Sequence, residues 1–450
     1  MKIKKKLLIT GFVILTFILT SLFIKLGTNK INSKIKANED VTFFVASDMH
    51  YLAKSLSDKG KAYNTFIESG DGKELNYIEE IMDAFVDDIK NKKPNVLILS
   101  GDLTTNGEDA SHIELAKKLK QVEGSGTSVY VIPGNHDVFN PYARSFKGDK
   151  QYKTDYVSDV DFSKIYGDFG YNDAVSRDKS TLSYLAAPSK DTWLLMLDTN
   201  KYENNVILGF PEAGGAISAS TFEWITKCSK LAKEHGAKIV TVMHQNLLDH
   251  VEGITKDFTI DNSKEALEGF KNAGLQVVLS GHIHIQDIKL NNSGSSPIYD
   301  IVTSALSVYP QQYGILKYSP KEGFDYSATQ VEVENYAKKL NLKDSNLINF
   351  KEYSKNSYET HAYKSALSRL YQTEEFTDEQ SKLIAKTKVM QNVARNMGKS
   401  NIDKETIINS PGFKLLETTK PDYLKKYLAS AYNNGIDNNK LNIPNSINIK

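Results

Sequence analysis

Residues 129–137 read VYVIPGNHD, a short apolar run that ends in a glycine turn carrying an amide, an imidazole and a carboxylate side chain. A short run of β-branched and aromatic residues bounded by Pro and Gly is typical of a buried strand. Polar side chains that follow such a strand lie at its carboxyl end, where open α/β sheets bind their ligands. The pattern therefore predicts a functional site if other strands end in the same way.

Four further apolar runs end in polar blocks of this kind. The blocks are Asp48-Met49-His50 after residues 41–47, Gly101-Asp102 after 96–100, His244 after 239–243, and Gly281-His282-Ile283-His284 after 277–280. Together the five blocks hold five of the nine histidines of the chain. We predict that all five segments converge on one crevice at the carboxyl ends of the strands.

Helical patterns alternate with these strands. Residues 76–90 place their apolar side chains on one helical face, and similar patterns follow from Ser111, over 218–233 and over 263–272. This alternation predicts an α/β domain, which we place at residues 40–333. Residues 298–332 carry strand-like runs without helices between them, so we expect the domain to close with antiparallel strands.

The composition changes after residue 333. Residues 334–450 are rich in Lys, Asn, Tyr and Ala with helical spacing, and no strand pattern recurs. Thr377 and Gln380 form a possible capping box. We therefore predict a C-terminal all-helical domain over residues 334–450. We interpret its apolar stripes as core packing, and a groove for a partner is the weaker alternative.

The first 28 residues differ from the rest of the chain. Lysines at positions 2 and 4–6 precede an uncharged apolar run of 18 residues, Leu7 to Ile24. That run exceeds the signal-peptide core of about 7 to 15 residues and reaches the roughly 17 to 25 needed to span a bilayer. We expect a membrane anchor at 1–28 and a linker at 29–39, with the rest of the chain outside the cell membrane. The alternative is a cleaved signal segment and a secreted protein.

The overall composition limits which classes of partner and which metal-ligand residues are possible. Among 450 residues, 56 Lys and Arg balance 55 Asp and Glu, so no global field favours nucleic acid and we expect no nucleic-acid binding. The single cysteine, Cys228, excludes an intramolecular disulfide and a Cys-based zinc site. Any metal must be held by His, Asp, Glu or Asn. The sequence does not set the oligomeric state.

The residue types in the five blocks suit two metal ions. Imidazole and carboxylate groups hold divalent cations such as Mn, Fe or Zn, and a shared carboxylate can bridge two of them. Asp48 and His50, two apart on an extended segment, are expected to point the same way and share one ion. His282 and His284 are likewise expected to point together, and the preceding Gly281 would allow a tight turn. Asp102 is best placed to be shared.

In their order along the chain, the five blocks resemble the signature of the calcineurin-like metallophosphoesterase superfamily: Asp-x-His, Gly-Asp, Gly-Asn-His-Asp or Glu, His, and Gly-His-x-His. Every block is present, and the resemblance covers about residues 41–333. It implies a β-sandwich flanked by helices and the activity of a metal-dependent phosphoester hydrolase. It also implies two ligand sets that share Asp102. The first is Asp48, His50, Asp102 and His284, and the second is Asp102, Asn135, His244 and His282.

The finer likeness is to class III cyclic-nucleotide phosphodiesterases. It rests on the Asp-Met-His opening, the Gly-Asn-His-Asp form and an exported chain with an added helical domain. We therefore predict an exported phosphodiesterase with two divalent or mixed-valence ions, acting on phosphate esters such as cyclic nucleotides. An extracellular phosphomonoesterase is the nearest alternative. A surface protein that binds metal or phosphate with little turnover is the other, although the complete ligand set and His136 favour catalysis.

Two side chains of the Gly-Asn-His-Asp turn are predicted to act in catalysis beside the metals. His136 follows the ligand Asn135 directly, so its side chain is expected to face the leaving group and to serve as general acid. Asp137 is expected to hydrogen-bond His136 or a ligand histidine and fix its tautomer. A turn-capping role for Asp137 is equally open.

Contacts to the substrate are expected from Asn135, His136, His244 and Arg144. Residues 138–180 form a long segment that we interpret as a substrate-side wall, in which Phe139, Tyr142 and Arg144 would meet a base or a phosphate, unless they simply pack an insertion. The remaining histidines lack ligand spacing, and we interpret them as surface or helix residues: His112, His235, His250 and His361.

Overall fold

The computed structural model describes residues 31–293, 296–373, 375–398, 404–418, 422–429 and 437–445. The expected anchor at residues 1–28 lies outside the described residues. Within the described ranges, no helix has both the length and the apolar character required to cross a bilayer.

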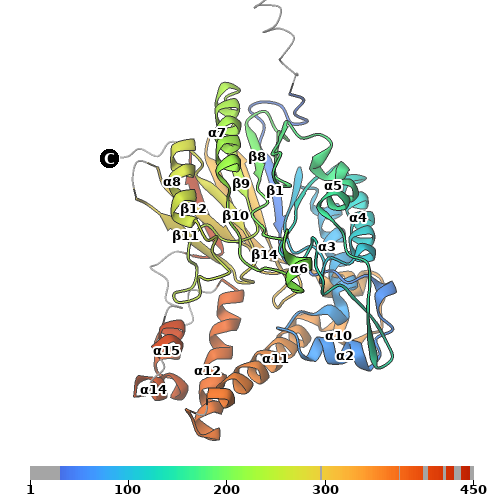
Figure 1. The fold of residues 1–450 in the computed structure, drawn as a ribbon, viewed down its shortest axis with the longest axis vertical. Coiled ribbons are helices and arrows are strands. Elements are labelled where there is room, and N and C mark those ends of the chain that lie inside the picture. The colour runs from blue at the N-terminus through green and yellow to red at the C-terminus, as the bar shows by residue number, and fades with distance from the viewer. Residues whose placement is uncertain are drawn as a thin grey trace, which may run out of the picture.

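Two sheets packed against each other form the centre of the molecule (Figure 1). The first sheet contains, in spatial order, β15 (Lys440–Pro444), β14 (Gly323–Gln330), β13 (Gln312–Ser319), β1 (Val41–Ala46), β2 (Val96–Ser100) and β3 (Ser128–Ile132). The second contains β11 (Asp287–Asn291), β12 (Ile298–Val302), β10 (Val277–Ser280), β9 (Lys238–Val242), β8 (Thr192–Met196), β7 (Tyr184–Ala186) and β6 (Ser176–Arg177).

Alternating side chains of the strands divide the interior into layers. On β8, Leu194 and Met196 belong to the largest apolar cluster, which also holds Phe43 and Val45 of β1. Their neighbour Leu195 faces the other way, into a cluster shared with the helices over the second sheet. Because successive strand residues point to opposite faces, both faces of the second sheet are covered. The predicted β-sandwich flanked by helices is confirmed.

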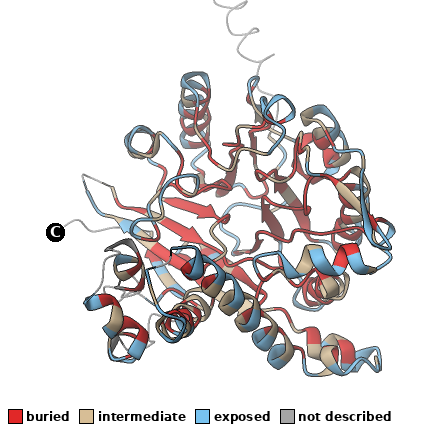
Figure 2. Ribbon diagram, turned by 60° about the horizontal axis from the view of Figure 1, so that its bottom comes forward, coloured by how far each residue is buried: buried red, intermediate tan, exposed pale blue. Residues whose placement is uncertain are grey.

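Helices cover the outer faces of both sheets, and Figure 2 shows buried strands behind outer helices whose far sides are exposed. On the first sheet lie α3 (Ile78–Lys92) and α4 (Asp109–Glu123), and on the second lie α7 (Ala219–Glu234) and α8 (Ser263–Ala273). The helix predicted at 76–90 is α3, preceded by the short η2 (Leu75–Tyr77). It ends where Lys93 adopts the left-handed φ of 49°, just before Pro94.

The strands after residue 297 agree only partly with the predicted antiparallel closure. β13 and β14 pair antiparallel with each other, and β13 pairs antiparallel with β1. β12 instead runs parallel to β10 and antiparallel to β11. The antiparallel strands therefore close the first sheet, whereas β12 extends the parallel part of the second.

The described part of the segment from residue 333 to 429 consists of helices and the turns between them. It contains α9 (Val333–Lys339), α10 (Ser345–Ile348), α11 (Phe350–Thr373), α12 (Asp378–Asn396), α13 (Lys404–Ile408), α14 (Pro411–Glu417) and α15 (Asp422–Ala429). The predicted capping box opens α12, with Thr377 and Gln380 each bonding the other's backbone N–H. The expectation that no strand follows is wrong for residues 440–444, because β15 pairs antiparallel with β14.

Residues 138–180 are more ordered than the loop expected there. They form the hairpin β4 (Arg144–Lys147) and β5 (Lys150–Lys153), the helix α5 (Asp159–Ile165) and the π-helical turn η3 (Gly167–Tyr171). The hairpin packs on α2 (Lys61–Glu68), where the rings of Phe66 and Phe146 lie 4.9 Å apart. The short helices η1 (Lys54–Leu56) and α6 (Asn205–Leu208) complete the described elements.

Candidate metal centre

The five polar blocks meet at one end of the sandwich, after β1, β2, β3, β9 and β10. Backbone strain is concentrated there. The residues Asp48, His50, Asp102, His282 and His284 all have φ between 45° and 70°, a region that non-glycine residues rarely adopt. Such strain persists only where the surrounding fold enforces it, and it is typical of functional sites. The left-handed turns aim these side chains inward, so the extended segment expected at residues 48–50 is wrong although the two side chains do converge.

The first cluster joins the Asp-x-His block to the last histidine. The ligand atoms of Asp48, His50, Asp102 and His284 all lie within 4.8 Å of one another. Nε2 of His284 lies 3.3 Å from Nε2 of His50 and 3.3 Å from Oδ1 of Asp48. Oδ2 of Asp102 lies 3.6 Å from Nε2 of His50. Four side chains from three different strands therefore surround one small volume.

The second cluster lies on the other side of Asp102. It contains Asp102, His244 and His282, and Oδ1 of Asn135 lies 3.1 Å from Nε2 of His244. Oδ1 of Asp102 lies 3.3 Å from that same Nε2. Because Oδ2 of Asp102 faces the first cluster and Oδ1 faces the second, this carboxylate has the arrangement that a bridging ligand needs.

Two observations show that the residues fit bound cations. Oδ1 of Asp48 is buried and approaches Nε2 of His284 at 3.3 Å without forming a hydrogen bond, although buried charges normally hydrogen-bond or coordinate a metal. In addition, two cluster histidines each direct one ring N–H away from the clusters. Nδ1 of His244 donates to Ser100 O at 2.9 Å, and Nε2 of His282 donates to Asp257 O at 2.7 Å. Each ring is thereby oriented with its other nitrogen available as a ligand.

The electrostatics of the clusters favour ionised carboxylates. Burial would raise the pKa of Asp102, but the imidazoles of His244 and His136 hold it well below its ordinary value. Burial alone would lower the pKa of His244, but the carboxylate of Asp102 outweighs it and raises that pKa to about 9. A cation entering the second cluster must therefore displace a proton from His244, as imidazole ligands require.

The glycines of the motifs allow close approach of the backbone. A Cβ on Gly134 would lie 2.2 Å from Oδ1 of Asp102, and one on Gly101 would lie 2.5 Å from Nδ1 of His244. A Cβ on Gly281 would lie 1.8 Å from Oγ of Ser47. Gly281 was expected to provide a tight turn, but it is absent from the described residues with positive φ. Its role is to leave room for the strand end of β1.

His136 lies beside the clusters and outside both ligand sets. Its backbone N–H donates to Oδ1 of Asp102 at 2.9 Å, and its Nδ1 donates to Thr105 O at 2.7 Å. Nε2 remains 3.9 Å from Oδ2 of Asp102, on a side chain that is 27% exposed. The structure thus places the imidazole of His136 next to the carboxylate of Asp102, with one ring nitrogen held by a hydrogen bond and the other accessible. Its role as general acid stays a prediction.

The hydrogen bonds of Asp137 fit one of its two predicted roles. Its carboxylate accepts the backbone N–H groups of Leu103, Thr104 and Gly134 at 2.8 to 3.0 Å. It is hydrogen-bonded to neither His136 nor a cluster histidine, so the predicted tautomer-fixing contact is wrong. The turn-capping alternative describes it, because Asp137 ties the turn after β2 to the turn after β3.

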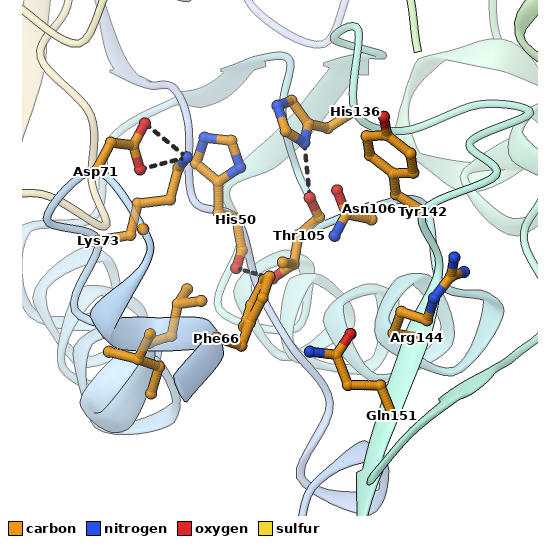
Figure 3. A pocket seen from close by; sticks show the side chains of 13 residues that line it. His50, Phe66, Asp71, Lys73, Thr105, Asn106, His136, Tyr142, Arg144 and Gln151 are labelled. Carbon is orange, nitrogen blue, oxygen red and sulfur yellow. Dashed lines mark hydrogen bonds and ion pairs between the residues drawn. The ribbon is translucent and has the colours of Figure 1, made fainter. Parts of the chain in front are cut away.

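A pocket of about 300 Å³ opens next to His50 and His136 (Figure 3). Tyr142 and Arg144 line it as predicted, whereas Phe139 is not among its lining residues and its ring lies 6.0 Å from that of Tyr202. Further polar and aromatic residues that line the pocket were not predicted, because they belong to no sequence motif: Phe66, Asp71, Lys73, Asn106 and Gln151. Arg144 also donates to the carbonyls of Pro141 and Ala143.

Two histidines without ligand spacing are buried. His112 lies in α4, where its Nδ1 is 2.8 Å from Tyr166 Oη and burial lowers its pKa to about 3. His250 was expected at the surface or in a helix, and that interpretation is wrong. It is buried in a loop, 2.9 Å from Asp287 and 3.2 Å from Asp300. Burial alone would lower the pKa of His250, but these two carboxylates raise it to about 9.

Residues 41–286 match the family described as Calcineurin-like phosphoesterase. The chain belongs to this family. It is a metal-dependent phosphoester hydrolase whose His and Asp clusters suit two metal ions. Residues 332–438 of this phosphoesterase match a second family, described as the C-terminal domain of cyclic nucleotide phosphodiesterase. No curated protein matches the chain.

Solved structures of similar fold include three with low sequence identity to this phosphoesterase. A dimetal phosphatase from Danio rerio is 13% identical, covers 64% of this chain and 95% of its own, and has a TM-score of 0.45. A putative 5'-nucleotidase from Staphylococcus aureus is 14% identical, with coverages of 71% and 58% and a TM-score of 0.39. GAP50 of Plasmodium, described as the anchor in the inner membrane complex, is 11% identical, with coverages of 65% and 85% and a TM-score of 0.36.

Proposed function

We propose that this phosphoesterase hydrolyses phosphodiesters, with cyclic nucleotides as its substrate class. The observation that carries the proposal is the match of residues 332–438 to the C-terminal domain of cyclic nucleotide phosphodiesterase. The same chain holds two His and Asp clusters that could each bind a metal ion. The pocket of about 300 Å³ beside His136 adds support, because Phe66 and Tyr142 offer aromatic faces to a base and Asn106 and Gln151 offer amides to its edge.

The chain supplies distinct groups for this reaction. Asp48, His50, Asp102 and His284 would hold one cation, and Asp102, Asn135, His244 and His282 the other. When bound, the cations supply a nucleophile from water near neutral pH and neutralise the charge of the phosphoryl oxygens. Thr105 O fixes the proton on Nδ1 of His136, so that the protonated ring would deliver its second proton from Nε2 to the leaving oxygen. Asn135, His136, His244 and Arg144 are the proposed substrate contacts.

A substrate panel tests the proposal. The full chain would be assayed with Mn, Fe or Zn on a cyclic nucleotide, an open phosphodiester and a phosphomonoester. We expect kcat/KM to be highest for the cyclic nucleotide. Higher kcat/KM on the monoester would replace this function with that of a phosphomonoesterase. Bound metal without turnover of any of the three would indicate a metal- or phosphate-binding protein instead.

We also propose that the catalytic domain lies outside the cell membrane, anchored by residues 1–28. The lysines before the apolar run and the length of that run support this orientation. Protease added to intact cells should digest the chain after residue 29, while untreated protein stays in the membrane fraction. A chain that resists the protease until the cells are lysed would contradict the orientation, and a shortened chain in the medium would indicate secretion.

A further inference from the structure

A second cavity lies between the catalytic domain and the C-terminal helices. It measures about 210 Å³ and is bounded by residues 283–285 on one side and by side chains of α11, α12 and α15 on the other. Pockets that hold whole drug-sized ligands usually measure about 300 to 1,000 Å³. This cavity, which we call the interdomain cavity, therefore suits a small group rather than a whole nucleotide.

Among the charged side chains that line the interdomain cavity, cations outnumber carboxylates. Arg369 of α11 and Lys388 and Arg395 of α12 all contribute to its wall. The single lining carboxylate is Asp71, which is 59% exposed and already paired with Lys73 at 2.8 Å. His361 adds a ring whose Nδ1 donates to Ser357 O at 2.9 Å, which leaves Nε2 for another partner. The cavity therefore carries an excess of positive charge.

Two of these three cations have no carboxylate partner in the described structure. Within the described residues, neither Arg369 nor Lys388 forms an ion pair with a carboxylate. Lys388 and Arg395 instead lie over the same ring, that of Tyr427, at 5.6 and 5.2 Å from its centre. Burial and the neighbouring Arg369 hold the pKa of Lys388 below its ordinary value. Gathering like charges around a partly buried space is unfavourable unless an anion occupies it.

We propose that the interdomain cavity binds a phosphate group, in addition to the phosphate processed at the metal centre. Arginine and lysine side chains that converge from two helices suit the several oxygens of a phosphate better than the two of a carboxylate. His284 lines the cavity and also belongs to the first metal cluster, so the two phosphates would lie on either side of one imidazole. The proposal that the cavity binds phosphate is independent of the proposed function. Only the proposal that this phosphate belongs to the substrate rests on that function.

Calorimetric titration of the metal-loaded full chain with inorganic phosphate tests the cavity. We expect two equivalents to bind. Lys388→Gln and Arg369→Gln should each weaken one of them by about tenfold or more, because a hydrogen bond to a charged group contributes on that order. Lys386→Gln is the matched control, since Lys386 is exposed on the same helix and does not line the cavity. Binding that is unchanged in both cavity variants, with their circular dichroism spectra native, would overturn the proposal.

The source of the phosphate follows from substrate kinetics of the same variants. A cyclic nucleotide would be compared with one that carries an additional phosphate monoester. If the substrate supplies the phosphate, Lys388→Gln should raise KM only for the second compound. If a separate phosphate ion occupies the cavity, KM should be unaffected for both compounds while the second binding equivalent is still weakened. Both outcomes support the cavity site. The titration remains informative if the cyclic nucleotides prove not to be substrates.

Discussion

Asp102→Asn is expected to abolish phosphoesterase activity. The two carboxylate oxygens of Asp102 face different clusters, with Oδ2 3.6 Å from His50 and Oδ1 3.3 Å from His244. An amide keeps one acceptor oxygen and turns an NH₂ group toward the other cluster, so it cannot bridge two cations. The loss in kcat/KM should exceed the roughly 10- to 100-fold that follows removal of a residue that only orients a ligand. Initial rates at saturating metal would measure it.

Asp168→Asn is the matched control for this substitution. Asp168 is 62% exposed, pairs with Lys120 and belongs to neither cluster, so the same chemical change there should leave turnover within twofold of the native rate. Near-native turnover of Asp102→Asn under the same conditions would show that the bridging assignment of Asp102 is wrong.

His136→Ala is expected to separate catalysis from metal binding. The side chain lies outside both clusters, with Nδ1 bound to Thr105 O and Nε2 accessible. A general acid typically contributes about 10²- to 10⁴-fold, and it matters most for a basic leaving group. The variant should lose activity in that range on a cyclic nucleotide, whose leaving group is a sugar alkoxide. It should lose much less on an aryl phosphodiester, whose phenolate leaves without a proton.

The control for this variant is His235→Ala, because His235 is an exposed histidine at the end of α7. It should match the native chain on both substrates. Equal losses of His136→Ala on the two substrates would indicate that His136 positions or charges the phosphate. Loss of bound metal would show that His136 is itself a ligand.

The sequence predicted the elements whose pattern is local. The strands that carry the five polar blocks and the helix α3 follow from apolar runs and helical periodicity within single segments. β15 was missed because it is only five residues long and, although Leu441 and Ile443 alternate with more exposed residues, only Ile443 is buried. It is an edge strand that is defined by pairing with β14, more than a hundred positions earlier in the chain, and no local pattern reveals such a partner.

In the candidate site, the sequence predicted the types of the residues but not the geometry that tertiary packing gives them. The residue types of the two clusters and the place of Asp102 in both followed from the sequence, whereas the left-handed backbone at Asp48 and His50 did not. Burial of His250 depends on Asp287 and Asp300, which lie in other segments. The pocket residues Phe66 and Lys73 belong to a segment without any motif. Their place beside His136 depends on tertiary packing.

The most direct test of the binuclear centre is the metal content of the purified full chain, counted by mass spectrometry alongside its activity. The chain would be stripped with a chelator and then titrated with Mn, Fe or Zn. The account predicts no turnover in the stripped protein and activity that rises until two equivalents are bound per chain. It also predicts that Asp102→Asn binds at most one. Full activity with a single equivalent, or turnover that survives complete removal of metal, would contradict it.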